Sequence, residues 1–233
     1  MKFVQLNKNL SLKFERFLGF FPGNSDILEN MKFKGDVADI GGGKQPYFSQ
    51  RPSHITYTGI DIDATELALA PPGVYTKTVV ADITRPPLDL KFDVIICRFV
   101  LEHVADTQAA IEGVYAMMKP GATCYISAPS RYAIFSKINI ILPETFKQWL
   151  LFKVYPAKQT DGFKAYYDKM SPSELSDIIK AQGGNIEQIH HTKFSGYFTF
   201  FFPLHLIWRL ISFIQMIFIR DYCERFEIVF RKN

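Results

Sequence analysis

The stretch from Asp36 to Asp63 constrains the fold of this chain more than any other. It begins with the short apolar run Val37–Ile40, which predicts a buried strand, and passes directly into the glycines Gly41–Gly43. Glycines at such a junction let the backbone approach a ligand closely. Pro46 suits the first turn of a helix, so we expect a strand, a glycine loop and a helix whose N-terminus faces the ligand.

A second apolar run, Tyr57–Ile60, leads to Asp61, about 20 residues after the glycines, where a carboxylate can accept hydrogen bonds from two ribose hydroxyls. A dinucleotide fingerprint needs a third glycine where this chain has Pro46, which argues against NAD or FAD. Asp39 precedes the turn and would lie near the cation of an amino-acid group. The pattern therefore predicts a nucleoside site with a cationic neighbour.

The order of Asp39, a spacer and Gly41–Gly43 resembles the first motif of the class I S-adenosylmethionine-dependent methyltransferases. The resemblance continues in the same order with Asp82 and Ile83, which in that family meet the adenine, and with the apolar strand 92–97. It implies that the residues after this strand line the methionine half of the cofactor. A helix from 106 to 118 and a strand from 122 to 128 follow in the family order.

The resemblance implies an α/β, Rossmann-like fold with a seven-stranded, mostly parallel sheet, an antiparallel last strand and helical insertions. It implies S-adenosyl-L-methionine as cofactor and S-adenosyl-L-homocysteine as product. The cofactor-binding residues would be Asp39, Gly41, Gly42, Gly43, Asp61, Ile62, Asp82, Ile83, Arg98 and Phe99.

The chain of 233 residues, with 48% hydrophobic side chains, can bury one sizeable core. We expect an N-terminal helical cap over residues 1–35 and a methyltransferase domain over 36–233. The basic, amphipathic N-terminal segment predicts a helix that covers the domain, or one that lies on anionic lipid or over the cofactor site. Widely spaced cysteines predict a cytoplasmic setting without a metal site, and we expect no nucleic-acid partner.

Residues 130–169 form an expected insertion on the acceptor side of the fold. They hold seven basic and three acidic residues, an excess that equals the net charge of +4 of the whole chain. A basic pocket favours an acidic or phosphorylated acceptor, whereas a solvated basic face would bind nothing. Aromatic side chains interleave with these charges, which solvation alone does not require.

A hydroxyl acceptor would need a general base. The candidates are His103, Tyr167, Asp168, His190 and His191, and none stands out from the others. Glu102, next to His103, is interpreted only as a helix cap.

The second informative stretch is 196–220, a mostly aromatic and aliphatic insertion between the strands expected at 185–191 and 225–231. If those strands pair in one sheet, as the last two strands do in the family that the chain resembles, both ends of the insertion lie on one side of any bilayer, and a single crossing is excluded. Its polar side chains recur at helical spacing and form one stripe, made of His205, Arg209, Ser212 and Gln215. The stripe would face the protein, while the apolar face of 197–219 would meet a membrane surface or the second copy of a homodimer.

The sequence thus predicts an S-adenosylmethionine-dependent methyltransferase, cytoplasmic or peripheral on the inner face of the cell membrane. The expected reaction is O-methylation of a glycan, a lipid-linked saccharide or another small acceptor at a membrane surface. C- or O-methylation of a prenylated ring is an alternative. A non-catalytic cofactor-binding protein with a regulatory or assembly role is the alternative from a different class.

Overall fold

The computed structural model describes residues 2–20, 27–87, 89–142 and 163–233. The strands are β1 Gly35–Ile40, β2 Ile55–Asp61, β3 Lys77–Val80, β4 Phe92–Arg98, β5 Met118–Pro129, β6 Gly184–Thr192 and β7 Arg225–Lys232. The helices are α1 Lys2–Phe17, α2 Ala64–Ala68, the 3₁₀ helix η1 Leu101–His103, α3 Thr107–Met117, α4 Ile134–Ile141, α6 Pro172–Ala181 and α7 Phe202–Phe218.

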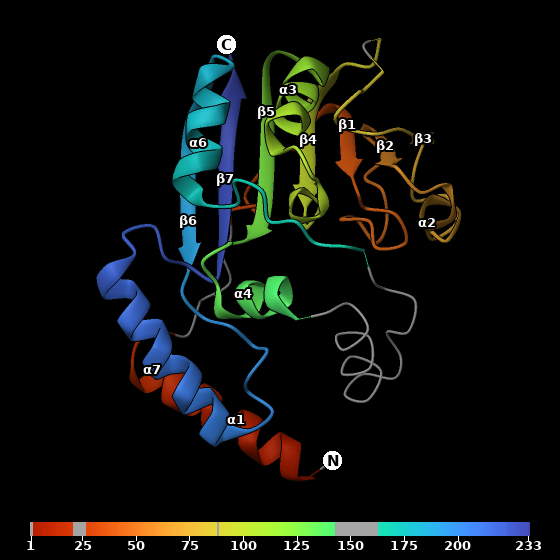
Figure 1. The fold of residues 1–233 in the computed structure, drawn as a ribbon. Helices are drawn as coiled ribbons and strands as arrows, with labels where there is room; N and C mark the ends of the chain where they lie inside the picture. The colour runs from red at the N-terminus through yellow and green to blue at the C-terminus, as the bar shows by residue number, and fades with distance from the viewer. Residues whose placement is uncertain (1, 21–26, 88, 143–162) are drawn as a thin grey trace.

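All seven of these strands lie in one sheet in the order β3-β2-β1-β4-β5-β7-β6. The pairs from β3 to β5 are parallel, and β7 runs antiparallel to both of its neighbours. The expected Rossmann-like methyltransferase topology is therefore confirmed. As Figure 1 shows, the carboxyl ends of the parallel strands meet at one edge, and α4 lies beneath that edge.

The core consists of two apolar layers, one on each face of the sheet. Successive residues of a strand point to opposite faces, so Ile95 and Cys97 join the layer packed against α3 and α6, while Val94 and Ile96 join the other. Burial of both faces explains why β4 is a continuous apolar run.

The helices on the first layer begin where the sequence provides caps. The Asp106 carboxylate accepts a hydrogen bond from the Ala109 N–H at 3.0 Å, which satisfies a free donor of α3. At α6, the Glu174 N–H donates to the Ser171 hydroxyl and that hydroxyl donates to the Glu174 carboxylate. Both helices are therefore fixed at their N-termini.

The expected helix after the glycine loop is wrong, because residues 41–54 form turns and irregular backbone. The Gln45 N–H closes a turn on the Gly42 carbonyl at 2.7 Å. The next N–H, that of Tyr47, donates to the Asp39 carboxylate at 2.8 Å. Because these contacts take the N–H groups on either side of Pro46, the chain turns here instead of starting a helix.

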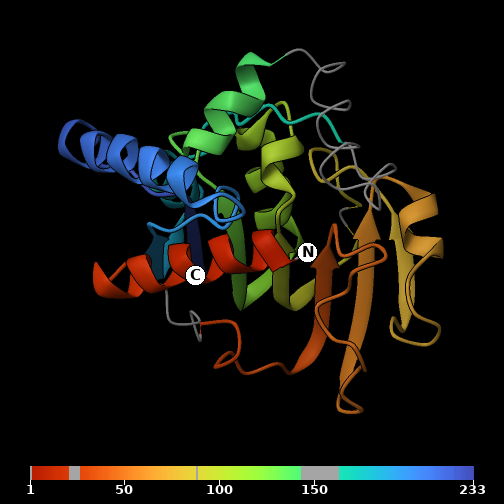
Figure 2. The same ribbon diagram turned by 90° about the horizontal axis from the view of Figure 1, so that it is seen from below.

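The apolar insertion between β6 and β7 forms α7, and α1 packs along it (Figures 1 and 2). Phe3 lies beside Phe201 and Phe20 beside Phe213, so the two helices run in the same direction. Among the described residues, no helix is long and apolar enough to cross a membrane.

Candidate functional site

The glycine loop lies at the carboxyl end of β1, at the edge where the parallel strands end. The Gly41 N–H donates to the Ile60 carbonyl at 2.7 Å, which ties the loop to β2. Gly41 has φ 67°, and a Cβ there would lie 2.2 Å from Val100 Cγ2, so only glycine fits. A Cβ on Gly43 would lie 3.2 Å from Asp61 Oδ2, which places Asp61 directly beside the loop.

Asp39 is buried at the base of this loop, with 1% of its surface exposed. Its Oδ2 accepts hydrogen bonds from the Tyr47 N–H and the Tyr57 hydroxyl. Among the described residues its Oδ1 has no hydrogen-bond partner. Burial raises the pKa of Asp39, although the bonds from Tyr57 and Tyr47 lower it. A buried carboxylate with one free oxygen fits a cationic group bound at the loop.

Tyrosines around Asp39 were missed by the sequence reasoning. The Tyr75 hydroxyl lies 3.5 Å from Asp39 Oδ2 and 3.5 Å from the Gly43 carbonyl, and its ring packs on that of Tyr57. A Cβ on Gly42 would lie 2.4 Å from the Tyr75 hydroxyl. The expected strands at 37–40 and 57–60 could have indicated Tyr57, because parallel pairing of β1 with β2 brings Tyr57 beside the strand that carries Asp39.

Asp61 ends β2 with its Oδ1 accepting from the Asp63 N–H at 3.0 Å. Burial is the main cause that raises its pKa, and the charges of Glu66 and Asp63 add to the effect. Ile62, the next residue, is 65% exposed and offers apolar surface to a flat ring. Such a pair suits a ribose and an adenine.

The remaining predicted cofactor residues lie at the ends of β3 and β4. Asp82 accepts from the Thr84 N–H and hydroxyl, both at 2.8 Å, while Ile83 packs in the core. An Arg98 Nη2–H donates to the Gln45 carbonyl at 3.3 Å, so this side chain spans the glycine loop. Phe99 has φ 56°, and its exposed side chain lies under the Arg225 guanidinium of β7, 6.0 Å from the ring centre.

The candidate base His103 follows β4, next to Glu102. His103 Nδ1 donates to the Lys164 carbonyl at 3.0 Å, which leaves Nε2 as the basic nitrogen, 4.0 Å from the Glu102 carboxylate. Glu102 is only 5% exposed, and its Oε2 has no partner among the described residues. Burial raises the pKa of Glu102 to about 7. The sequence interpretation of Glu102 as a helix cap did not predict that its carboxyl group is buried beside His103.

Tyr167 and Asp168 are tied into the structure. Tyr167 is buried, and its hydroxyl accepts from the Asn139 amide at 3.2 Å. Asp168 accepts from the Thr107 N–H at 3.0 Å at the start of α3. Burial raises the pKa of Tyr167, which makes it a poor base.

His190 and His191 lie on β6, opposite Glu227 and Phe226 of β7. Strands β4, β5 and β7 separate β6 from β1, a distance of about 19 Å at the usual strand spacing. The structure therefore does not bring these two histidines to the glycine loop.

The basic insertion is described only in part, because residues 143–162, with Lys147, Lys153 and Lys158, lie outside the described residues. Arg131 pairs with Glu174 at 2.9 Å, and Lys169 donates to the Gln108 side chain at 3.2 Å. These charges have partners within the chain.

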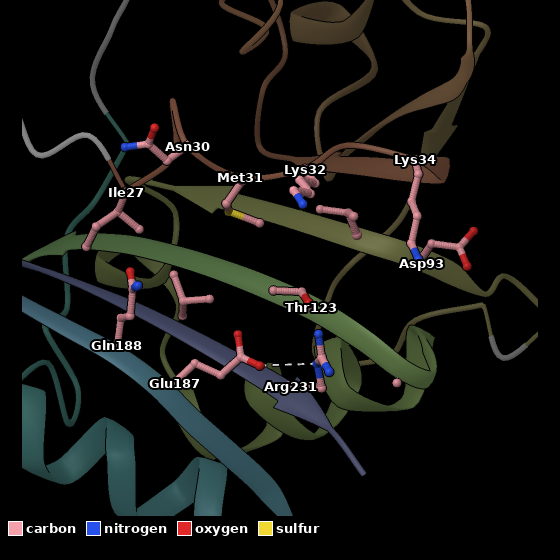
Figure 3. Close-up of a pocket in the computed structure, with 13 residues that line it drawn as sticks. Ile27, Asn30, Met31, Lys32, Lys34, Asp93, Thr123, Glu187, Gln188 and Arg231 are labelled. Atoms are coloured by element: carbon pink, nitrogen blue, oxygen red, sulfur yellow. Dashed lines mark ion pairs between the residues drawn. The ribbon is translucent and has the colours of Figure 1, made fainter.

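A cavity of about 650 Å³ lies elsewhere (Figure 3). The cavity is lined by the segment before β1, by the amino-terminal parts of β4 and β5, and by β6 and β7; the lining residues include Met31, Lys34, Asp93, Thr123, Glu187 and Arg231. None of the predicted cofactor residues lines it. The cavity is therefore separate from the glycine-loop site.

The residues at the glycine loop fit S-adenosylmethionine. Packing at Gly41 and Gly42 leaves no room for a Cβ, so the loop can follow this path only with glycines. Asp61 can hold the ribose, and the free oxygen of Asp39 can face the cationic methionine group. When bound, the sulfonium supplies an activated methyl group, and the protein has to align an acceptor with it.

Comparison with known proteins agrees with this geometry. A family described as a methyltransferase domain matches residues 8–189. A ubiquinone biosynthesis O-methyltransferase from Marinobacter nauticus is 25% identical over 186 residues, which cover 79% of this chain and 69% of that relative. The chain spans less than two thirds of the length of relatives with the same name from Pseudomonas.

Two solved structures share the fold. A SAM-dependent methyltransferase from Methanosarcina mazei has a TM-score of 0.53 and 16% identity, covering 91% of this chain and 99% of that one. A Haemonchus contortus phosphoethanolamine N-methyltransferase, solved with S-adenosylhomocysteine, has a TM-score of 0.53 and 18% identity, covering 97% of this chain and 52% of that one. With a family match over most of its length, the chain belongs to the class I S-adenosylmethionine-dependent methyltransferases and is an enzyme.

Proposed function

We propose that the enzyme methylates a hydroxyl oxygen of a small acceptor that is presented at a membrane surface, such as a lipid-linked saccharide or another glycan. The observation that carries the proposal is the His103–Glu102 pair, which follows β4 at the same sheet edge as the glycine loop. Helix α4 lies beneath this edge (Figure 1). Its exposed apolar residues, Ile138, Ile140 and Ile141, suit an acceptor with an apolar anchor.

In the proposed reaction the acceptor oxygen attacks the methyl carbon, and the carbon–sulfur bond breaks with its electron pair going to sulfur, which yields S-adenosylhomocysteine. The hydroxyl proton moves to His103 Nε2. The Lys164 carbonyl holds the ring in the required tautomer, and the Glu102 carboxylate stabilises the imidazolium that forms. Glu102 is thus a positioning residue.

Methylation of a prenylated ring is the second candidate. Its support is the name of the relatives, ubiquinone biosynthesis O-methyltransferase, together with the same apolar surface. The base and the cofactor residues would serve both acceptors.

The test is to incubate the purified protein with methyl-labelled S-adenosylmethionine and lipid extracts from cells that lack it, and to analyse the products by mass spectrometry. We expect a labelled product with an O–CH₃ group, and its headgroup separates the saccharide from the prenylated ring. Transfer to nitrogen or carbon, or to water-soluble extracts alone, would contradict the proposal.

His103→Gln should lower kcat about 100-fold or more, because a general base contributes that much, while cofactor affinity stays unchanged by calorimetry. The matched control is His190→Gln on β6, which should leave kcat unchanged. Equal kcat values for the His103 variant and the wild type would exclude His103 as the base.

A further inference from the structure

In the pair of helices α1 and α7, polar side chains are buried and many apolar side chains are exposed. The fully buried side chains of this pair are mostly polar: Asn7, Ser11 and Glu15 are the buried residues of α1, and α7 buries His205, Arg209 and Ser212 along with Trp208. Two helices that pair in water normally turn their apolar sides toward each other. Here the polar sides meet, with aromatic contacts such as Phe14–Phe202 beside them, and many other apolar side chains are left outside.

An ion pair fixes this orientation. The guanidinium of Arg209 donates through Nε and Nη2 to the two oxygens of Glu15, and His205 Nε2 lies 2.8 Å from the same carboxylate. Both members of the ion pair are at most 1% exposed. A buried charge without its partner is very costly, so neither helix can rotate about its axis to hide its apolar face.

The outer face of α7 is entirely apolar. Its large exposed side chains are all apolar, and between 38% and 80% of the surface of each is accessible to solvent. They are Leu206, Ile207, Leu210, Ile211, Ile214, Ile217 and Phe218. The outer apolar strip of α1 consists of Phe3, Leu6, Leu10 and Phe17. Soluble monomers rarely expose so many contiguous apolar groups, so these faces require a covering partner.

The charges beside this surface favour one covering partner, an anionic lipid surface, over a second copy of the chain. Exposed side chains of α1 include Lys2, Lys8, Lys13 and Arg16, and Arg220 directly follows α7. The only acidic residue of either helix is the buried Glu15. A second copy of the chain would bring two like-charged sets together, which is unfavourable, whereas anionic lipid headgroups complement them.

We propose that the outer faces of α1 and α7 dock in the plane of an anionic lipid bilayer. The apolar side chains enter the headgroup boundary, and the basic residues of α1 contact lipid phosphates. This inference rests on the proposed action at a membrane surface and gives its contact surface. The ring of Phe135 in α4 stacks on that of Tyr197 with ring centres 3.7 Å apart, which joins the segment that leads into α7 to the helix beneath the glycine-loop edge.

Vesicle flotation of the full chain tests the proposal without any acceptor. We expect co-flotation with phosphatidylcholine vesicles that contain phosphatidylglycerol, and weak binding to phosphatidylcholine alone or at high salt. Leu210→Asp with Ile217→Asp should lower the partition coefficient about tenfold or more, because both side chains lie on the outer face. Phe213 is unsuitable for this test because its ring packs on Phe20.

The matched control is Leu69→Asp with Val80→Asp, two exposed apolar residues near β3, at the opposite edge of the sheet. It should bind vesicles like the wild type, and circular dichroism confirms that both variants fold. Lys8→Gln with Lys13→Gln should lose the preference for anionic vesicles. If the wild type stays off anionic vesicles and sediments as a dimer that the Leu210 and Ile217 changes dissociate, the covering partner is a second copy and the proposal is wrong.

Activity on acceptor dispersed in detergent separates this inference from the proposed function. The Leu210 and Ile217 variant should keep that activity while losing vesicle binding. A protein that binds vesicles but transfers no methyl to any hydroxyl would contradict the proposed function and leave the docking surface supported.

Discussion

Two buried glutamates in this enzyme have opposite environments. Glu15, between α1 and α7, is fully enclosed, and hydrogen bonds from His205 and Arg209 lower its pKa against the effect of burial. Glu102, after β4, is almost as buried but has an oxygen without a partner among the described residues, and burial raises its pKa to about 7. The same side chain is therefore a fixed anion in one region and a titratable group in the other.

The opposite pKa shifts of Glu15 and Glu102 distinguish a structural carboxylate from one that can take part in a reaction. A carboxylate paired on both oxygens holds two elements in one orientation, and its proton affinity is too low to matter near neutral pH. A carboxyl group that is buried without a partner costs stability, which native proteins tolerate mainly at functional sites. We therefore assign Glu15 to the docking helices and Glu102 to the reaction.

Removing the partner of Glu15 should have the largest effect. Arg209→Met leaves the buried Glu15 carboxylate without its cationic partner and with only His205 beside it, and should lower the free energy of unfolding by about 3–5 kcal/mol, measured with urea. The double variant Glu15→Met with Arg209→Met should recover most of that loss, because no charge remains buried. Equal losses in the single and double variants would mean that the ion pair is not what fixes the helices.

The next effect concerns Glu102. Its folded-state pKa of about 7 exceeds the ordinary value of 4.5, so the folded protein binds more protons between these values and stability falls as pH rises through that window. This decline is on the order of 3 kcal/mol and is complete above the folded-state pKa. Glu102→Gln should flatten it in urea titrations at several pH values. An unchanged slope would show that Glu102 does not titrate there.

Asp61 at the cofactor site lets cofactor binding be tested separately from the two glutamates. Asp61→Ala should weaken S-adenosylmethionine binding by about 1.5–3 kcal/mol per lost bond, because a charge-assisted hydrogen bond to the ribose disappears. Calorimetry measures the binding free energy, and the pKa values of Glu15 and Glu102 should not change. A folded Asp61 variant with wild-type affinity would remove this residue from the site.

The smallest effect is the acid response of the helix pair. Because the pKa of Glu15 lies below 4.5, its stabilising contribution is complete above that pH and is lost as pH falls through the lowered value. The double variant Glu15→Met with Arg209→Met, which leaves neither charge of the pair buried, should therefore reduce the acid sensitivity of vesicle binding. A variant with the same acid midpoint as the wild type would assign that midpoint to other carboxylates.

Local patterns predicted some of these features well. The seven-stranded, mostly parallel sheet was an expectation of the family resemblance, whereas the polar stripe of α7 followed from its 3.6-residue period; His205, Arg209 and Ser212 are indeed buried. The partner of the stripe was not predictable, because Glu15 lies 194 residues from Arg209 and no local period links them. The helix expected after the glycines failed because a buried carboxylate took the Tyr47 N–H, a tertiary effect.

The 194-residue separation of Glu15 and Arg209 also bears on how the protein is made. Contacts so distant along the chain form late, since the loop between them must close first. During synthesis α1 emerges long before α7, so its basic, amphipathic surface is available alone while the sheet assembles. Closure of the ion pair would then be a final step of assembly, completed only after the translating ribosome has released Arg209.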